Sequence, residues 1–330
     1  MTQALMLRDG TKMSGWAKPK AGSATTEPAV KYGVEYYREQ FEKKRVTYAP
    51  IRMALVGKEN TAKTGLALDI ALAHTDKEII VIDCDNSAQN TVDYLISNNG
   101  LDADRIRVIP MIDEMDDAMW NEDNTTNWVA VVEKLEWFTS CLGESNESIG
   151  AVILDGGSTF LKWCEFVMTA RLINRGVIQD NAEGFAQKEW RERNRVFKSV
   201  INRLTALPIP YMFFTFHLKD HSTYVETGGG KKELMKVGEK VDWAKDTQRF
   251  VSQQIFLTRV TKKGDKTAGV VADRNLAEGE FVIRASIEEM KGRNMEHLGK
   301  TYDVLQVKSD KIKWNGLPFT WLPLPTVEDN

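Results

Sequence analysis

Short runs of apolar residues recur along the middle of the chain and are separated by stretches with helical spacing. The runs at Arg52–Val56, Glu78–Ile82 and Arg105–Pro110 are continuous rather than alternating, and so are those at Ala151–Leu154 and Tyr211–Phe216. Continuous apolar runs are typical of strands that are buried on both faces of a parallel sheet. The pattern therefore predicts an α/β fold with a mainly parallel central sheet flanked by helices.

Helices are predicted between these strands. One spans Thr64–Ala73, a second begins near Ser87, and a third follows an acidic loop and is capped by Asn124 or Thr125. Two more helical stretches separate the fourth and fifth strands, the second of them at Glu189–Leu207.

The last third of the chain has a different pattern. After a Gly- and Lys-rich segment (TGGGKKELMK), which we interpret as a loop, shorter apolar runs predict a C-terminal β extension. Its expected strands lie near Gln254–Val260, Gly269–Asp273, Phe281–Ile287, Tyr302–Val307 and Lys311–Trp314.

The composition is that of an ordinary globular protein. The formal net charge is -3, so the overall balance does not by itself call for a nucleic-acid or membrane partner. Its 3 cysteines lie far apart without metal-ligand spacing. No apolar run of about 18 residues is present. We expect a soluble cytoplasmic protein that does not associate with a membrane.

A phosphate-binding loop is predicted where the first strand meets the first helix, in the segment GKENTAKT. Such a loop curls backbone N–H groups around phosphates, while a lysine reaches the terminal phosphates and a hydroxyl holds Mg²⁺. Lys63 and Thr64 occupy those two positions. Ala62 replaces the second glycine of the pattern, which is compatible with close backbone approach if its φ is negative. The residues expected to bind ATP are Gly57, Lys58, Glu59, Asn60, Thr61, Ala62, Lys63, Thr64 and Gly65.

Carboxylates and a histidine follow the neighbouring strands. Asp155 closes the run GAVILD and is predicted to hold Mg²⁺ together with Thr64, the alternative being a loop or cap residue. Asp85 is the candidate that orients the attacking water, with Asp83 next and Gln89 less favoured. One of the two aspartates is instead expected to cap the following helix if it has no catalytic role.

His217 ends the fifth strand and is the candidate sensor of the terminal phosphate, the alternative being a structural histidine.

The order of these motifs (GKENTAKT, DCD, AVILDGGS, KEWRERNRVFKSVINRL and YMFFTFH) resembles the RecA-like P-loop ATPases. The nearest likeness is to Sak4-type nucleotide-binding proteins of phages and archaeal viruses, which are related to RadA and RecA. The resemblance implies ATP hydrolysis, single-stranded DNA binding and assembly into a homo-oligomeric ring or filament, with a role in recombination, annealing or replication. It also implies that Arg293, within Lys291-Gly292-Arg293, acts in trans as an arginine finger, the alternative being a solvated turn.

A second resemblance is to the ParA/MinD-type ATPases. Lys58 directly follows Gly57, as their signature lysine does, and DCDNSAQN is similar to their acidic motif. It implies partition or positioning activity by a dimer that closes around ATP. Glu59 and Asn60 depart from that family's glycines, so the RecA-like resemblance is favoured. A nucleotide-binding scaffold with little turnover is the third interpretation.

The RecA-like interpretation divides the chain into three parts. Residues 1–45 are expected to be a flexible arm with a helix at Tyr32–Lys44, residues 46–300 the ATPase core, and residues 301–330 a C-terminal β or extended tail. Single-stranded DNA is expected to contact basic loops of the core, with exposed soluble turns as the alternative. The candidate residues are Lys231, Lys232, Lys262 and Lys263.

Overall fold

The computed structural model describes residues 50–99, 103–144, 146–179, 185–227, 231–261, 276–291, 294–309 and 311–319. All of them belong to one compact unit, Tyr48–Pro325. The expected helix at Tyr32–Lys44 and the expected strand at Gly269–Asp273 lie outside the described residues.

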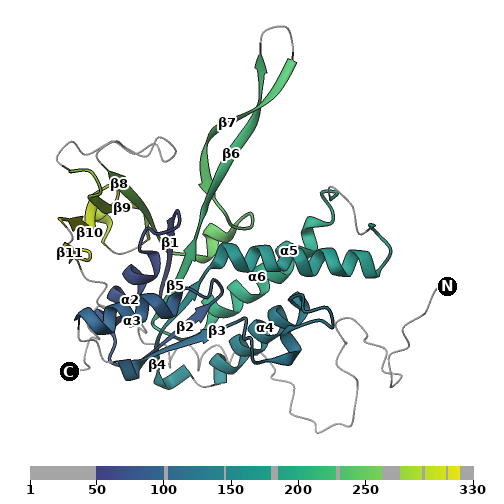
Figure 1. Ribbon diagram of the computed structural model, residues 1–330, viewed down its shortest axis with the longest axis horizontal. Helices are drawn as coiled ribbons and strands as arrows, with labels where there is room; N and C mark the ends of the chain where they lie inside the picture. Colours follow the sequence, from purple (N-terminus) through teal and green to yellow (C-terminus); the bar gives the residue numbers. More distant parts are fainter. Residues whose placement is uncertain are drawn as a thin grey trace, which may run out of the picture. The chain divides into compact units, whose positions relative to one another are not determined.

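The described strands form a nine-stranded sheet in the order β11-β10-β9-β8-β1-β5-β4-β2-β3 (Figure 1). The strands from β3 to β8 in that order run parallel, and β8 to β11 pair antiparallel. The prediction of a mainly parallel α/β sheet with a C-terminal β extension is therefore confirmed. The bounds are β1 Ile51–Gly57, β2 Glu78–Asp83, β3 Ile106–Pro110, β4 Ile149–Asp155, β5 Tyr211–Phe216, β8 Gln253–Thr261, β9 Phe281–Met290, β10 Thr301–Lys308 and β11 Lys311–Trp314.

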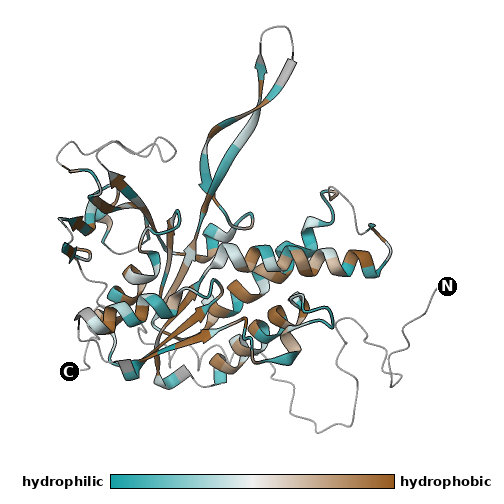
Figure 2. Cartoon of the chain, viewed as in Figure 1, coloured by the Kyte–Doolittle hydropathy of each residue, from teal (hydrophilic) through white to brown (hydrophobic). Residues whose placement is uncertain are grey.

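Helices cover both faces of this sheet (Figure 1). One buried cluster joins side chains of α4, α5 and α6 to the sheet, and a second joins side chains of α2 and α3 to its other face. The apolar residues of Figure 2 accordingly concentrate on the strands and on the inner sides of the helices. This double burial is why the strands read as continuous apolar runs. The bounds are α2 Lys63–His74, α3 Ala88–Asn99, α4 Trp128–Glu144, α5 Gly157–Asn174 and α6 Trp190–Ala206.

The start of α4 differs from the prediction. Asn127 Oδ1 accepts a hydrogen bond from the Ala130 N–H at 3.2 Å, so Asn127 caps the helix rather than Asn124 or Thr125. Asn124 instead adopts a positive φ of 61° in the preceding turn. Short 3₁₀ turns complete the fold at Ala103–Arg105, Asp117–Met119, Asn146–Ser148, Thr247–Phe250 and Met295–His297.

Residues 231–236 of the Gly- and Lys-rich segment belong to a strand, not to the loop that the sequence suggested. Strands β6 (Leu218–Thr227) and β7 (Lys231–Val241) pair with each other and form a two-stranded sheet of their own (Figure 1). The loop interpretation was wrong because neither face of this ribbon is buried, so its sequence lacks the apolar run that marked the other strands. Tyr224, for example, is 70% exposed.

Candidate functional site

The predicted phosphate-binding loop lies where β1 ends and α2 begins, at the carboxyl edge of the parallel strands. Gly57 is the last residue of β1, and a Cβ atom there would lie 2.4 Å from Thr61 Oγ1 and 2.5 Å from the Leu257 carbonyl oxygen. The Thr61 hydroxyl donates to the Lys58 carbonyl at 2.8 Å. The loop is therefore wound too tightly for any side chain at position 57.

Ala62 adopts a conformation that the sequence analysis did not anticipate. It precedes the first residue of α2 with φ 58° and ψ 30°, in the left-handed region. The condition of a negative φ, on which close backbone approach by alanine was argued, is not met, because the turn into α2 has the backbone conformation that glycine adopts without steric cost. Ala62 therefore holds the loop in a strained conformation.

Lys63 is folded back into the loop that precedes it. Its ammonium group donates to the carbonyl oxygens of Gly57 at 3.2 Å and Lys58 at 2.8 Å. Burial lowers the pKa of Lys63 below its usual range, and the negative charges of Asp155, Asp85 and Glu59 oppose that decrease. Lys63 thus places a buried positive charge inside the loop, against loop carbonyls and near the carboxylates of Asp155 and Asp85.

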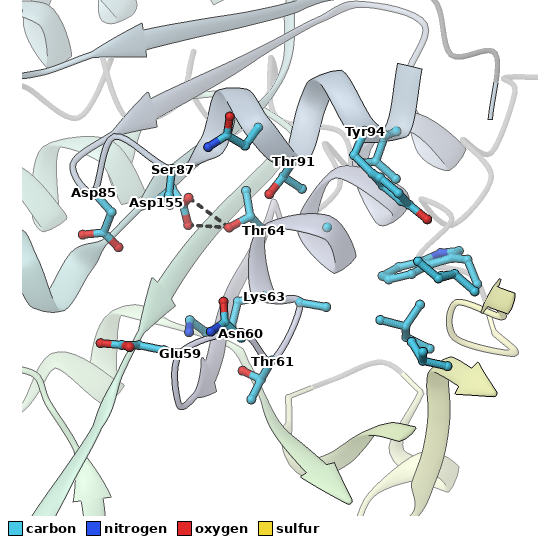
Figure 3. Close-up of a pocket in the computed structure, with 18 of the residues that line it drawn as sticks. Glu59, Asn60, Thr61, Lys63, Thr64, Asp85, Ser87, Thr91, Tyr94 and Asp155 are labelled. Carbon is cyan, nitrogen blue, oxygen red and sulfur yellow. Dashed lines mark hydrogen bonds between the residues drawn. The ribbon is translucent and has the colours of Figure 1, made fainter. Parts of the chain in front are cut away.

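Asp155 lies at the end of β4 and is held by two hydroxyl groups. Thr64 Oγ1 lies 2.9 Å from both of its carboxylate oxygens, and Thr215 Oγ1 donates to Oδ1 at 2.7 Å (Figure 3). Thr215 also accepts from the Gly156 N–H at 2.8 Å, which ties β5 to the end of β4. Burial raises the pKa of Asp155 to about 6, although the hydrogen bonds from the two threonines favour its charged form.

The two aspartates at the end of β2, Asp83 within the strand and Asp85 just after it, have different surroundings. The Asp83 carboxylate accepts hydrogen bonds from the backbone N–H groups of Asp85, Ser87 and Ala88, so it caps the start of α3. Asp85 lines the same cleft as Lys63 and Thr64 (Figure 3).

His217 lies beside Asp85, with its Nε2 atom 3.6 Å from Asp85 Oδ2. Burial opposes ionisation of Asp85, but hydrogen bonds from His217 and Thr159 and the charges of His217 and Lys63 outweigh it. They lower the pKa of Asp85 below its usual range. The structure thus places His217 beside Asp85. The lowered pKa keeps the Asp85 carboxylate ionised near neutral pH.

The remaining loop candidates are divided between the cleft and its surroundings. Glu59, Asn60 and Thr61 line the cleft (Figure 3). Lys58 forms an ion pair with Glu239 of β7 at 2.9 Å. Gln89 lies on the exposed side of α3 and donates to Asp93 at 2.7 Å.

The candidate DNA-binding residues are only partly described. Lys231 and Lys232 are the first two residues of β7, and nothing of their side chains is described. Lys262, Lys263 and Arg293 lie outside the described residues.

The loop opens into a cleft of about 890 Å³ that the sequence analysis did not foresee. Besides the residues above, it is lined by Tyr94 and Leu95 of α3 and by apolar side chains of β9, β10 and β11. No local signal marks these residues, because they come from opposite ends of the sheet order and meet only in the folded chain.

The described residues contain no cluster of three or more His, Cys, Asp or Glu side chains that could hold a metal ion unaided. They also contain no helix that is long and apolar enough to span a membrane. The first finding is compatible with Mg²⁺, which usually binds one or two protein groups together with water and substrate phosphates.

Comparison with known proteins gives similarity to solved structures. No family model matches the chain, and no curated protein matches it. A solved structure described as the RadB recombinase is similar over 80% of this chain and 91% of that chain, with a TM-score of 0.38 and 13% sequence identity. Similarity at this level is too low to carry an inference about activity or partners, so the functional argument rests on the site.

Proposed function

We propose that this protein is a P-loop ATPase that binds ATP with Mg²⁺ and hydrolyses it. The observation that carries the proposal is the convergence of three groups at one edge of the sheet. These are the buried Lys63 ammonium at the start of α2, the Thr64 hydroxyl beside it, and the Asp155 carboxylate 2.9 Å from that hydroxyl. A lysine, a hydroxyl and a strand-end carboxylate are the set that P-loop NTPases use.

The residues present fit Mg²⁺ and a triphosphate. Thr64 and Asp155 supply the hard oxygen atoms that Mg²⁺ prefers, and Lys63 supplies a fixed positive charge for phosphate oxygens. When bound, the metal would neutralise charge that develops on the phosphates. Because Thr64 and Asp155 already contact each other, little rearrangement of their backbone is needed to present both oxygens together.

Asp85 is proposed to orient the attacking water. Its carboxylate lines the cleft with Lys63, and its lowered pKa keeps it able to accept a hydrogen bond from water at neutral pH. His217, at 3.6 Å, is proposed to report the state of the site to the hairpin β6–β7, which begins at the next residue.

The test is phosphate release from ATP by the wild-type protein and by Lys63→Ala. A matched control is Lys77→Ala, because Lys77 is an exposed lysine that donates only to the Glu147 carbonyl among the contacts described for its ammonium group. We expect turnover to be lost in Lys63→Ala and kept in Lys77→Ala. Equal turnover in all three proteins would contradict the proposal.

Action on single-stranded DNA is a further part of the proposal, supported by the RecA-like order of motifs and the basic residues after β5. The hydrolysis assay is therefore run with and without single-stranded DNA at two salt concentrations. DNA-stimulated turnover that weakens with salt is expected, and it should be reduced in Lys231→Ala/Lys232→Ala and in Lys262→Ala/Lys263→Ala. The matched control is Lys134→Ala/Lys162→Ala, which removes two helix lysines. Equal stimulation in every variant would contradict it.

Assembly and the trans role of Arg293 are proposed on the RecA-like resemblance alone. An Arg293→Ala protein retains its own Lys63, and a Lys63→Ala protein retains its own Arg293. Mixing the two inactive variants is therefore expected to restore part of the activity if the arginine acts across a subunit boundary. No recovery on mixing would contradict a trans role.

A further inference from the structure

The cleft beside the phosphate-binding loop has two chemically different halves. The half formed by the loop and the ends of β2 and β4 carries charged and hydroxyl groups, among them Lys63, Thr64 and Asp155. The other half lies toward α3 and the antiparallel strands. It is lined by Tyr94, Phe281, Leu305, Val307, Ile312 and Trp314. Figure 3 places Tyr94 well apart from Asp85 and Glu59 across the cleft.

The two halves meet at Gly65, the residue after the proposed metal ligand Thr64. A Cβ atom on Gly65 would lie 3.5 Å from Trp314 Cη2 and 3.9 Å from Thr91 Cγ2. The Trp314 ring therefore lies over the first turn of α2, directly beside the phosphate half. A ligand bound to Lys63 and Thr64 would extend toward this ring.

The Trp314 ring lies against α2, with Gly65 and Asp69 of that helix near two different edges of the indole. Its benzo edge faces Gly65, while its Nε1 atom lies on the side of Gly316, where the Asp69 carboxylate also lies. Burial raises the pKa of Asp69, and the Trp314 indole N–H opposes that rise. Among the described residues Nε1 has no hydrogen-bond partner although it is buried on the Asp69 side, and the ring contributes an apolar surface to the cleft.

Apolar side chains in this half remain partly exposed although they line a concave site. Tyr94 is 43% exposed and Ile312 is 52% exposed. Partly exposed aromatic and aliphatic groups that converge on a cleft beside a few polar groups are typical of small-molecule sites. The matching ligand has a polyanion at one end and a flat apolar group at the other, as a nucleoside triphosphate does.

We propose that this half of the cleft, which we call the base subsite, binds the nucleobase between α3 and β11 with Tyr94 and Trp314 as its aromatic contacts. The inference rests on the proposed function and adds its substrate class. The lining side chains from β9, β10 and β11 are apolar or aromatic, so they recognise the flat ring rather than its hydrogen-bonding edge. Recognition by contact area favours the larger purines over pyrimidines and discriminates weakly between adenine and guanine.

Calorimetric titration with Mg²⁺ and five probes tests the base subsite: ATP, GTP, CTP, UTP and inorganic tripolyphosphate. In the wild-type protein ATP and GTP should bind within about tenfold of each other, and both more tightly than CTP, UTP and tripolyphosphate. Trp314→Ala should weaken ATP binding by about 10- to 100-fold, and Tyr94→Ala should weaken it to a smaller extent. Both variants should leave tripolyphosphate binding unchanged, because its contacts lie in the phosphate half.

Two further variants act as controls. Trp314→Phe keeps a flat ring and should bind ATP within a few-fold of the wild type, which separates loss of the ring from misfolding. Trp137→Ala removes a tryptophan that is 73% exposed on α4 and should bind every probe as the wild type does.

The outcomes separate this inference from the proposed function. Tripolyphosphate binding as tight as ATP binding, an equal loss of both in Trp314→Ala, or an ATP-to-GTP ratio above about 100 would overturn the base subsite alone. Binding of none of the five probes would overturn the proposed function as well.

Discussion

The hydroxyl oxygen of Thr64 lies 2.9 Å from each carboxylate oxygen of Asp155, which joins the first turn of α2 to the end of β4 across the sheet. Strand β5 lies between β4 and β1, and its Thr215 donates to the same carboxylate at 2.7 Å. Three elements therefore converge on one buried acid. Its burial has a cost in stability, and this cost makes the protonation of Asp155 testable without any activity assay.

Replacing Asp155 with asparagine is expected to raise the stability of the folded protein above pH 6. Burial raises the pKa of Asp155 from 3.8 to about 6. Between those values the folded protein keeps a proton that the unfolded chain has released, so stability falls as the pH rises through this range. The loss reaches up to about 3 kcal/mol, and asparagine avoids it.

Urea unfolding of the wild type and Asp155→Asn at about pH 5 and about pH 7.5 checks this expectation. The difference in free energy of unfolding, variant minus wild type, should be about 1 kcal/mol larger at about pH 7.5 than at about pH 5. Other titrating groups are shared by the two proteins and largely cancel. A relative stability that is independent of pH would show that Asp155 is not the titrating group.

Replacing Thr64 separates the hydroxyl from the fold. Thr64→Ala removes one donor to a buried carboxylate and one proposed Mg²⁺ ligand, whereas Thr64→Ser keeps the hydroxyl. A hydrogen bond to a charged group contributes about 1.5–3 kcal/mol, so Thr64→Ala should lower the affinity for Mg²⁺-ATP by roughly 10- to 100-fold. Titration of ATP with Mg²⁺ and with EDTA measures this, and Thr64→Ser should stay near the wild type. If the serine variant is as weak as the alanine variant, the methyl group and not the hydroxyl matters.

Ala62→Gly is expected to stabilise the protein. An L-residue in the left-handed region costs roughly 1–2 kcal/mol, and the greater freedom of glycine in the unfolded chain offsets about 0.4–1 kcal/mol of the gain. The matched control is Ala73→Gly, the same change at an exposed position of α2, which should cost about 0.5–1 kcal/mol. Opposite signs in urea unfolding are expected. A loss of stability in both variants would mean that position 62 carries no strain.

Asp85→Asn should reduce turnover by roughly 10²- to 10⁴-fold while leaving nucleotide affinity nearly unchanged, because the proposed role of Asp85 is to orient water. His217→Ala should reduce turnover to a smaller extent, since His217 lines the cleft beside Asp85 but its proposed role is to report the state of the site rather than to orient water. Gln89→Ala is the control, because Gln89 donates to Asp93 on the outside of α3. Single-turnover hydrolysis and ATP titration together measure both quantities. Reduced turnover in Gln89→Ala and normal turnover in Asp85→Asn would reverse the assignment.

The sequence predicted those parts of the molecule that depend on local pattern. Five of the six parallel strands were predicted from continuous apolar runs, and four of these, β1, β2, β4 and β5, are buried along nearly their whole length. Lys63, Thr64 and Asp155 were predicted to lie together because strand ends of a parallel sheet share one edge. The hairpin β6–β7 was missed because neither of its faces is buried, so no continuous apolar run marks it. The φ of Ala62 depends on the winding of the loop. The contact between Trp314 and Gly65 depends on the order of strands, which periodicity does not encode.

Lys58 forms an ion pair within its own chain, because its ammonium group lies 2.9 Å from Glu239 Oε1. The ion pair between Lys58 and Glu239 connects the phosphate-binding loop to the hairpin. Glu239 also lies 3.8 Å from Lys236 on β7. If Lys58 acts within the chain, Lys58→Ala and Glu239→Gln should change the protection of the hairpin amides against hydrogen exchange to the same extent. A partly buried pair of this kind contributes about 1 kcal/mol or less, so overall stability should change little.

The ParA-like interpretation makes the opposite prediction for assembly, because there the lysine reaches the nucleotide of a partner subunit. Lys58→Ala would then abolish ATP-dependent association, whereas Glu239→Gln would leave it intact. Light scattering of the two variants with and without ATP measures this directly. We expect the variants to associate to the same extent, since both remove one contact between β7 and the loop. Selective loss of association in Lys58→Ala would favour a nucleotide-bridged dimer over the RecA-like proposal.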